Sequence, residues 1–425
     1  MPASAALALV PNLRIVARDP AAETEALLGV AGWAAQFTPG VAIEFPSTLL
    51  LDVSGSLKLF GGIALLSERL RRGVAEMGYG GVLAAAPTPR AASWLAAAGD
   101  DKPVLDAAKL DAALAPLPVS VLRQDKTTLG TLEGIGIRTL GELRALPREG
   151  VARRFGQALL DDLDRALGRL PDPRNFFVPP AKFRAGLELP AEVTQADALL
   201  FAAKRLVVQL AGFLAARSGG VQRFSLKLEH RDRAATEIAV GLVAPSRSAE
   251  HFTLLLRERL ASIGLREPVR SIALAADDVV PLPGANHALL LEEGKPPGQW
   301  QHLVERLRAR LGGAAVHGLA ARGEHRPERA AAVVEPGATQ SKLEFGDRPI
   351  WLLDPPRPLR EIGEVPHHEG PLQLLTGPER IESGWWDGDD AVRDYFVART
   401  PEDSLVWIYR DRRGEGGWYL HGVFA

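Results

Sequence analysis

Residues 37–56 decide the fold of the N-terminal part and read Phe-Thr-Pro-Gly-Val-Ala-Ile-Glu-Phe-Pro-Ser-Thr-Leu-Leu-Leu-Asp-Val-Ser-Gly-Ser. The apolar runs 41–43 and 49–53 predict two short strands, because Pro46 and Ser47 between them are turn residues. Around them the sequence predicts helices and one more strand, in this order: helix 22–37, helix 63–77, strand 82–85 and helix 89–98. This alternation predicts an α+β fold with helices packed on one sheet.

The chain has 425 residues, 46% of them hydrophobic and 24% charged, which is the composition of a soluble protein with several domains. No run approaches the roughly 18 apolar residues that span a bilayer, and no signal peptide is evident. The absence of cysteine excludes disulfides, thiolate nucleophiles and cysteine-based metal sites. We therefore expect a cytoplasmic protein with no membrane partner.

Charge is unevenly distributed along the chain, although the formal net charge is only −2. Residues 204–233 hold seven basic and two acidic side chains. Residues 341–425 hold ten basic and sixteen acidic side chains, and five of the eight tryptophans. A basic middle and an acidic, tryptophan-rich end predict separate modules with separate partners.

Residues 128–143 predict two short helices around a tight Gly134-Ile135-Gly136 hairpin, with Thr139 at the start of the second helix. Glycine permits the backbone angles of such a hairpin. It also lets a phosphate approach the amides that we expect to be exposed at the N-terminus of the second helix. With Arg138 beside it, this pattern resembles a helix-hairpin-helix that grips a DNA backbone. The alternative is a helical corner without a ligand.

Residues 181–285 predict the element order β-α-β-β-α-β of a ferredoxin-like domain. The expected strands and helices are 183–189, helix 196–216, 221–228, 238–243, helix 248–263 and 269–275. Strict alternation in 221–228 places Arg223, Ser225 and Lys227 on the open face of the sheet. This face is either a surface that tracks DNA or simply a solvated sheet face.

The last stretch predicts a helix over 299–311, a linker up to residue 337, an extended segment 354–358 and a compact β module over 371–424. Strands are expected at 393–398, 405–410 and 417–423. His367, His368 and His421 lack partners at ligand spacing, so we expect no metal site there, only a solvated loop. Trp385 and Trp386 are expected in the core or in a protein interface.

The order of these modules resembles a Y-family (translesion) DNA polymerase, with a palm, a helix-hairpin-helix thumb and a little finger. In active members of that family the palm strand reads Ser-x-Asp-Glu, an apolar pair, then Leu-Asp-Val-Thr-Gly. Residues 51–55 match the close of this motif, but the Asp-Glu pair falls on Ser47 and Thr48. Hydroxyls cannot replace the carboxylates that hold two Mg²⁺ ions. The resemblance therefore implies no catalytic residues, no metal and no cofactor.

Further motifs are similar to the ImuB subfamily, which is catalytically degenerate. They are Leu59-Phe60-Gly61-Gly62, residues 325–330, the run Gly377–Gly388 with its Trp385-Trp386 pair, and the C-terminal residues 418–425. The resemblance implies that the opening palm strand of the family is lacking. The domain organisation expected from the resemblance is as follows: 1–116, palm/fingers-like and N-terminally incomplete; 117–180, thumb-like; 181–285, little-finger-like; 286–346, helix and linker; 347–425, C-terminal protein-interaction module.

Within the expected linker, residues 340–345 resemble the peptide by which bacterial proteins bind the sliding clamp. Leu343 and Phe345 would fill an apolar pocket on the clamp, and Gln340 would form a hydrogen bond at its rim. A flexible flank lets such a peptide reach its partner, and tethering raises its effective concentration on DNA.

The resemblance implies a DNA- and clamp-binding adaptor in SOS-induced, error-prone translesion synthesis, part of a bacterial mutasome. The implied partners are damaged or primer–template DNA, the β sliding clamp, the RecA-like accessory protein ImuA and an error-prone DnaE-type polymerase. Two alternatives remain open from the sequence. One is an active lesion-bypass polymerase with unrecognised metal ligands, and the other is a plain helix-hairpin-helix DNA-binding protein.

Overall fold

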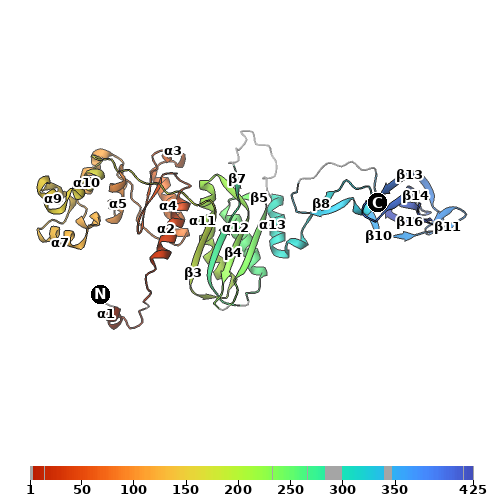
Figure 1. The fold of residues 1–425 in the computed structure, drawn as a ribbon, viewed down its shortest axis with the longest axis horizontal. Helices are drawn as coiled ribbons and strands as arrows, with labels where there is room; N and C mark the ends of the chain where they lie inside the picture. The colour runs from red at the N-terminus through yellow and green to blue at the C-terminus, as the bar shows by residue number, and fades with distance from the viewer. Residues whose placement is uncertain are drawn as a thin grey trace. The chain divides into compact units, whose positions relative to one another are not determined.

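The computed structural model describes residues 3–13, 15–231, 233–265, 267–282, 299–338, 347–414 and 416–424. The chain divides into two compact units, Met1–Gln299 and Trp300–Ala425. Both units mix helices and strands (Figure 1). The predicted mixed α/β character is therefore confirmed.

The first unit opens with a small β hairpin among short helices. Its elements are α1 (Ala3–Leu9), α2 (Pro20–Ala34), β1 (Val41–Glu44), β2 (Thr48–Leu51), α3 (Leu57–Phe60), α4 (Ile63–Glu76), α5 (Pro89–Ala97), α6 (Leu110–Leu114), α7 (Lys126–Gly134), α8 (Leu140–Ala145), α9 (Arg148–Phe155) and α10 (Gln157–Ala166). Strands β1 and β2 pair antiparallel across the predicted turn. The strand predicted over 82–85 is wrong, because those residues are extended but join no ladder. Ala85 accepts one hydrogen bond, from Val104.

One apolar core runs through α5 to α10. Trp94 and Leu95 of α5 are buried together with Leu132, Leu143 and Leu160 of the following helices. Leucine side chains of this kind each contribute about 1.5–3 kcal/mol when fully buried. This core lies on both sides of the domain boundary expected at residue 116.

An antiparallel sheet with two long helices forms the rest of the first unit. Its elements are β3 (Phe183–Val193), α11 (Ala196–Ala216), β4 (Gly219–Glu229), β5 (Thr236–Ser246), α12 (Ala249–Ser262), β6 (Val269–Ala276) and β7 (Val279–Pro281). The predicted order β-α-β-β-α-β is observed. Ser248 caps α12, because its hydroxyl oxygen accepts a hydrogen bond from the His251 amide at 3.2 Å.

The strand order of this sheet is β3-β6-β4-β5, with β7 paired to β4. A ferredoxin-like sheet has its first and third strands at the centre, whereas here the second and fourth, β4 and β6, are central. The ferredoxin-like label is therefore wrong in its strand order. The alternation along β4 predicts which face of the strand is buried. It does not predict which strands pair with β4, because different antiparallel partners bury the same face.

Helix α11 is long and apolar enough to cross a membrane by length and composition alone. However, 61% of its most apolar window is buried inside the protein. Leu199, Leu206, Leu210 and Leu214 are all buried. This is the pattern of a core helix, which covers β3, β4 and β6.

Helix α11 also packs closely against α2, and Figure 1 shows the two side by side. Trp33 of α2 lies between two glycines, Gly73 of α4 and Gly212 of α11, and a Cβ on either would overlap the indole ring. Glycine at these positions therefore allows three helices to approach one buried tryptophan, which is 5% exposed.

The second unit is built on a five-stranded antiparallel sheet of order β10-β16-β15-β14-β13. Its elements are α13 (Gln299–Leu311), β8 (Gly318–Ala321), β9 (Ala331–Val334), β10 (Trp351–Pro358), β11 (Arg360–Ile362), β12 (Val365–His367), β13 (Gln373–Ser383), β14 (Ala391–Arg399), β15 (Leu405–Asp411) and β16 (Gly417–Val423). The three strands predicted over 393–423 are confirmed. The linker predicted up to residue 337 is wrong, because β8 and β9 pair as a hairpin there.

Replacing Gly212 with Ala tests the packing around Trp33. We expect Gly212→Ala to destabilise the first unit by about 1–3 kcal/mol, the usual cost of overpacking a core. Scanning calorimetry of the full chain measures this. The control is Gly150→Ala in α9, where a Cβ meets nothing within 4 Å. There we expect no loss, or a gain of up to about 1 kcal/mol from helix propensity. Equal effects of the two substitutions would contradict the packing argument.

Candidate nucleic-acid interface

Ser47 and Thr48, the residues at the expected metal-ligand positions, lie at the tip of the β1–β2 hairpin, where Ser47 is exposed and Thr48 is partly buried. Thr48 opens β2 directly opposite Glu44 of β1. Its hydroxyl oxygen accepts a hydrogen bond from the Arg123 guanidinium at 2.9 Å. A fixed positive charge at this distance opposes a divalent cation at the same place. The surroundings of Thr48 are therefore unfavourable for two-metal chemistry.

Glu44 lies opposite Thr48 in the β1–β2 hairpin, and its carboxylate already has hydrogen-bond and ion-pair partners. It accepts a hydrogen bond from the Ser93 hydroxyl at 2.6 Å and lies 3.2 Å from Arg174 and 3.4 Å from Arg90. Its side chain is 20% exposed. Burial by itself raises the pKa of Glu44, but the Ser93 hydrogen bond and the two arginines together hold it below its ordinary value. This carboxylate is a structural ion-pair partner.

The Glu44 ion pairs extend into a network that joins distant elements. Arg90 of α5 also lies 3.3 Å from Asp162 of α10, and Arg174 also pairs with Asp172. The network thus ties the β1–β2 hairpin to α5, to α10 and to the segment that follows α10. Asp52 has a different, local role, because its Oδ1 accepts from the Ser54 amide at 3.1 Å and the Ser54 hydroxyl at 2.7 Å.

Glu44→Gln tests whether this carboxylate serves structure. The substitution leaves two partly buried guanidiniums short of a counter-charge, so we expect a loss of about 1–3 kcal/mol at pH 7 in EDTA. Folding lowers the pKa of Glu44, so the carboxylate contributes its full stabilisation when the pH is above its pKa in the unfolded chain. This stabilisation is lost as the pH falls through the pKa of Glu44 in the folded protein. The free energies of unfolding of wild type and Glu44→Gln therefore converge in acid. Calorimetry from pH 7 to pH 3 measures this, with exposed Glu68→Gln as control. Equal stability of Glu44→Gln and wild type at pH 7 would overturn the assignment.

The Gly134-Ile135-Gly136 hairpin forms between α7 and α8, as the sequence predicts. Gly136 has φ +88°, a left-handed conformation that favours glycine, and Ile135 is 44% exposed. Thr139 caps α8 in a capping box with Glu142. The local structure therefore matches two short helices around an exposed turn.

The amides expected to be free for phosphate are, however, already satisfied. The Glu142 carboxylate accepts from the Arg138 and Thr139 amides at 2.7 and 3.0 Å. The next two amides, of Leu140 and Gly141, donate to the carbonyls of Leu117 and Ala115. The prediction of exposed amides at the N-terminus of α8 is therefore wrong. The first amides of a helix need hydrogen-bond acceptors, and here the capping box and neighbouring carbonyls provide them in place of a phosphate.

Arginines near the hairpin divide into paired and unpaired side chains. Arg144 pairs with Asp111, and Arg148 lies 2.5 Å from Asp164. Arg138, Arg153 and Arg154 are exposed and have no ion pair within the described residues. These three remain available to an anionic ligand.

The open face of the sheet carries the second predicted group. Arg223, Ser225 and Lys227 alternate with the buried Phe224 and Leu226 along β4, so the predicted shared face is observed. Lys227 is partly neutralised by Glu229 at 2.6 Å, whereas Arg223 has no ion pair in the described part of the chain.

The neighbours of these residues on the open face are small. Ser225 lies between Ala239 of β5 and Ala275 of β6, and Lys227 lies between Glu237 and Ala273. The face is therefore shallow, with Arg223 near one end and acids near the other. The hairpin belongs to the α5–α10 core and this face to the β3–β7 sheet, so the two predicted groups lie on separate parts of the first unit. The third predicted group, Gln340, Leu343 and Phe345, lies outside the described residues.

The second unit contains a buried arginine that sequence reasoning missed. The Arg326 side chain is 1% exposed. It donates to both carboxylate oxygens of Asp387 at 3.0 and 2.7 Å, to Glu324 at 2.8 Å and to the Asp389 carbonyl at 2.8 Å. The hydrogen bonds from Arg326 lower the pKa of Glu324 and Asp387 to about 2. Two sequence signals pointed to this region: Arg326 belongs to the motif 325–330, and acids flank Trp385 and Trp386 in the loop between β13 and β14.

His421 lies on β16, within the predicted strand 417–423, and its side chain is 1% exposed, so the solvated loop expected for the three histidines is wrong for this one. Its Nδ1 lies 2.8 Å from the Tyr395 hydroxyl, and its ring stacks near Trp407 at 5.9 Å. Burial lowers the pKa of His421 to about 4. Trp385 and Trp386 are 79% and 57% exposed, so the core alternative for this pair is wrong.

His421 makes the stability of the second unit depend on pH. The folded unit holds the imidazole neutral down to about pH 4, whereas the unfolded chain takes up a proton near pH 6.5. We therefore expect up to about 3 kcal/mol of stability to be lost as the pH falls from about 6.5 to about 4. Calorimetry of the second unit's transition measures this in wild type and His421→Gln. The control is exposed His317→Gln, which should keep the wild-type profile. An unchanged slope in His421→Gln would contradict the assignment.

No protein-family model matches the chain. The chain is 29% identical over 458 aligned positions to Protein ImuB of Caulobacter vibrioides strain NA1000 / CB15N, with all of this chain and 98% of the relative covered. Protein ImuB of strain ATCC 19089 / CIP 103742 / CB 15 matches to the same extent.

Among solved structures, a Dbh ternary complex matches with 16% identity and a TM-score of 0.33, over 66% of this chain and 84% of that chain. DinB from Sulfolobus solfataricus matches with 16% identity and a TM-score of 0.34 over the same shares. The full-length similarity to Protein ImuB confirms the resemblance that the sequence motifs predict.

Proposed function

We propose that this chain is a non-catalytic, Y-family-like adaptor for damage-induced, error-prone translesion synthesis in the bacterial cytoplasm. It would hold primer–template DNA and the sliding clamp while another polymerase performs synthesis. The proposal rests on the similarity to ImuB and on the chemistry around the β1–β2 hairpin.

The observation that carries the proposal is the state of the three side chains nearest the expected metal site. Ser47 and Thr48 offer only hydroxyls, Arg123 donates to Thr48 at 2.9 Å, and Glu44 is bound by Ser93 and two arginines. Phosphoryl transfer by two metals needs carboxylates that hold both ions and neutralise developing charge. None of these groups supplies that.

DNA binding is supported by the unpaired cations of the first unit. Arg138 next to the Gly134-Ile135-Gly136 hairpin and Arg223 on the open sheet face are exposed. Such side chains bind phosphates without reading sequence. Since the amides at the N-terminus of α8 already donate hydrogen bonds within the protein, we assign phosphate binding at the hairpin to side chains such as Arg138.

Partner binding is assigned to the remaining parts of the chain. Gln340, Leu343 and Phe345 would dock on the β sliding clamp. The second unit would recruit the ImuA-like accessory protein and the DnaE-type polymerase, for which the exposed Trp385 and Trp386 are suitable anchors.

Primer extension and clamp binding by the same purified protein test the proposal. We expect no extension with Mg²⁺ or Mn²⁺, and clamp binding that falls at least tenfold in Leu343→Ala/Phe345→Ala. The matched control is Leu319→Ala, which removes an exposed leucine of β8 and should bind the clamp as wild type does.

Each alternative has its own outcome in this experiment. Metal-dependent extension would mean that the chain is an active lesion-bypass polymerase with unrecognised ligands. DNA binding without extension or clamp binding would leave a plain helix-hairpin-helix DNA-binding protein. Either result would overturn the adaptor proposal.

A further inference from the structure

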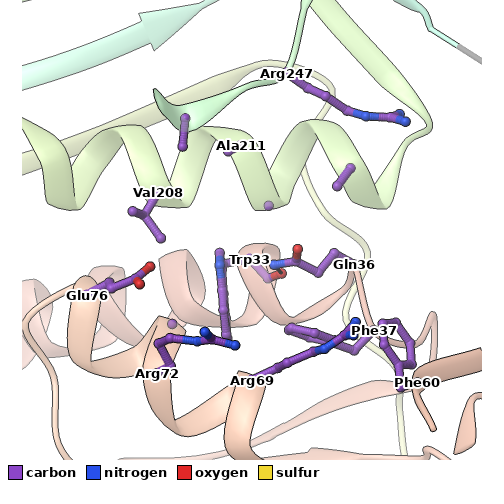
Figure 2. A pocket seen from close by; sticks show the side chains of 14 residues that line it. Trp33, Gln36, Phe37, Phe60, Arg69, Arg72, Glu76, Val208, Ala211 and Arg247 are labelled. Carbon is purple, nitrogen blue, oxygen red and sulfur yellow. Dashed lines mark hydrogen bonds between the residues drawn. The ribbon is translucent and has the colours of Figure 1, made fainter. Parts of the chain in front are cut away.

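A pocket of about 450 Å³ opens within the first unit, and Figure 2 shows the side chains that line it. Helices α2 and α4 form one wall, and α11 with the start of α12 forms the other. Its volume falls within the range of about 300–1,000 Å³ that is usual for small-molecule sites. Neither Ser47 nor Thr48 lines it, so it is separate from the expected polymerase centre.

The polar lining of this pocket is strongly basic. Arg69 and Arg72 lie three residues apart on α4, and Arg247 comes from the opposite wall (Figure 2). None of the three has an ion pair within the described residues, although Arg247 donates one hydrogen bond, to the Leu282 carbonyl at 3.1 Å. The pocket contains one carboxylate, Glu76. Three guanidiniums against one carboxylate leave a net positive charge that an anionic ligand would neutralise.

Apolar and aromatic side chains line the rest of the pocket. Phe60 and Phe37 pack together with a ring-centroid distance of 5.3 Å, and the Arg69 guanidinium lies 5.6 Å from the centre of the Phe60 ring. Phe60 is only partly buried, so part of its ring remains accessible. Trp33, which lies between Gly73 and Gly212 and is 5% exposed, also lines the pocket.

We propose that this pocket binds a phosphate-bearing ligand of nucleotide size. Guanidinium groups bind phosphate oxygens in pairs, and three of them match a di- or triphosphate better than a single carboxylate. The aromatic wall at Phe60 suits the flat base or sugar of such a ligand. The same chemistry is offered by a free nucleotide and by the 5′-phosphate end of a DNA strand.

A bound ligand would contact both walls at once, α4 from one side and Arg247 from the other. It would therefore stabilise the packing of α2 and α4 against α11 and raise the melting temperature of the first unit. This inference is independent of the adaptor proposal, because it involves neither the hairpin turn nor the clamp peptide.

Calorimetric titration of the full chain in EDTA tests the proposal, because no metal-dependent site contributes under that condition. The probes are dATP, sodium tripolyphosphate and a 5′-phosphorylated oligonucleotide with its unphosphorylated counterpart. We expect saturable binding of dATP or of the phosphorylated end. Binding should fall at least tenfold in Arg69→Gln/Arg72→Gln.

The matched control is Arg71→Gln, which removes a charge from the same helix. Arg71 does not line the pocket and lies 3.6 Å from Asp101. It should bind the probes within twofold of wild type, and unchanged melting temperatures of the free variants would show that both are folded. Binding of dATP alone identifies a free nucleotide, and preference for the phosphorylated oligonucleotide identifies a strand end.

Three results would overturn the proposal. They are no saturable binding of any probe up to millimolar concentration, equal loss in Arg71→Gln, and displacement of bound probe by a polyglutamate peptide at lower concentration than by tripolyphosphate. The last would identify an acidic peptide as the ligand.

Discussion

The ion pairs of Glu44 with Arg90 and Arg174 are the constraint on which the arrangement of the N-terminal helices depends. This one carboxylate connects the β1–β2 hairpin to α5, and through Arg90 and Asp162 to α10. Breaking a partly buried pair of this kind is costly because it leaves charge without compensation. The carboxylate of Glu44 therefore stabilises the fold of the N-terminal part.

Local patterns predicted most of the secondary structure. The alternation along β4, the helix over 196–216 and the position of Thr139 at the start of α8 are each set within a few residues of sequence, and each is observed. The order of strands in the sheet could not be predicted in the same way. Several orders bury the same faces, so the choice of β4 and β6 as central strands depends on packing over the whole unit.

Arg223 and Lys227 lie on the exposed face of β4 that the alternation predicts, but the charged surroundings of the candidate residues were only partly predictable. What the sequence could not reveal is pairing across long separations, as between Glu44 and Arg174 or Thr48 and Arg123. The same reason explains the occupied amides of α8, whose acceptors include carbonyls of Ala115 and Leu117 from a preceding segment.

The Arg326 cluster has a consequence for where the second unit begins. Composition alone makes residues 312–337 resemble a spacer, yet this arginine supplies the counter-charge for Asp387 and contacts the backbone of Asp389. A fragment starting at residue 347 would lack Arg326, and the loop that carries Trp385 and Trp386 would lose the hydrogen bonds that hold Asp387 and Asp389. A fragment that keeps these contacts must include the segment between β8 and β9, which carries Arg326.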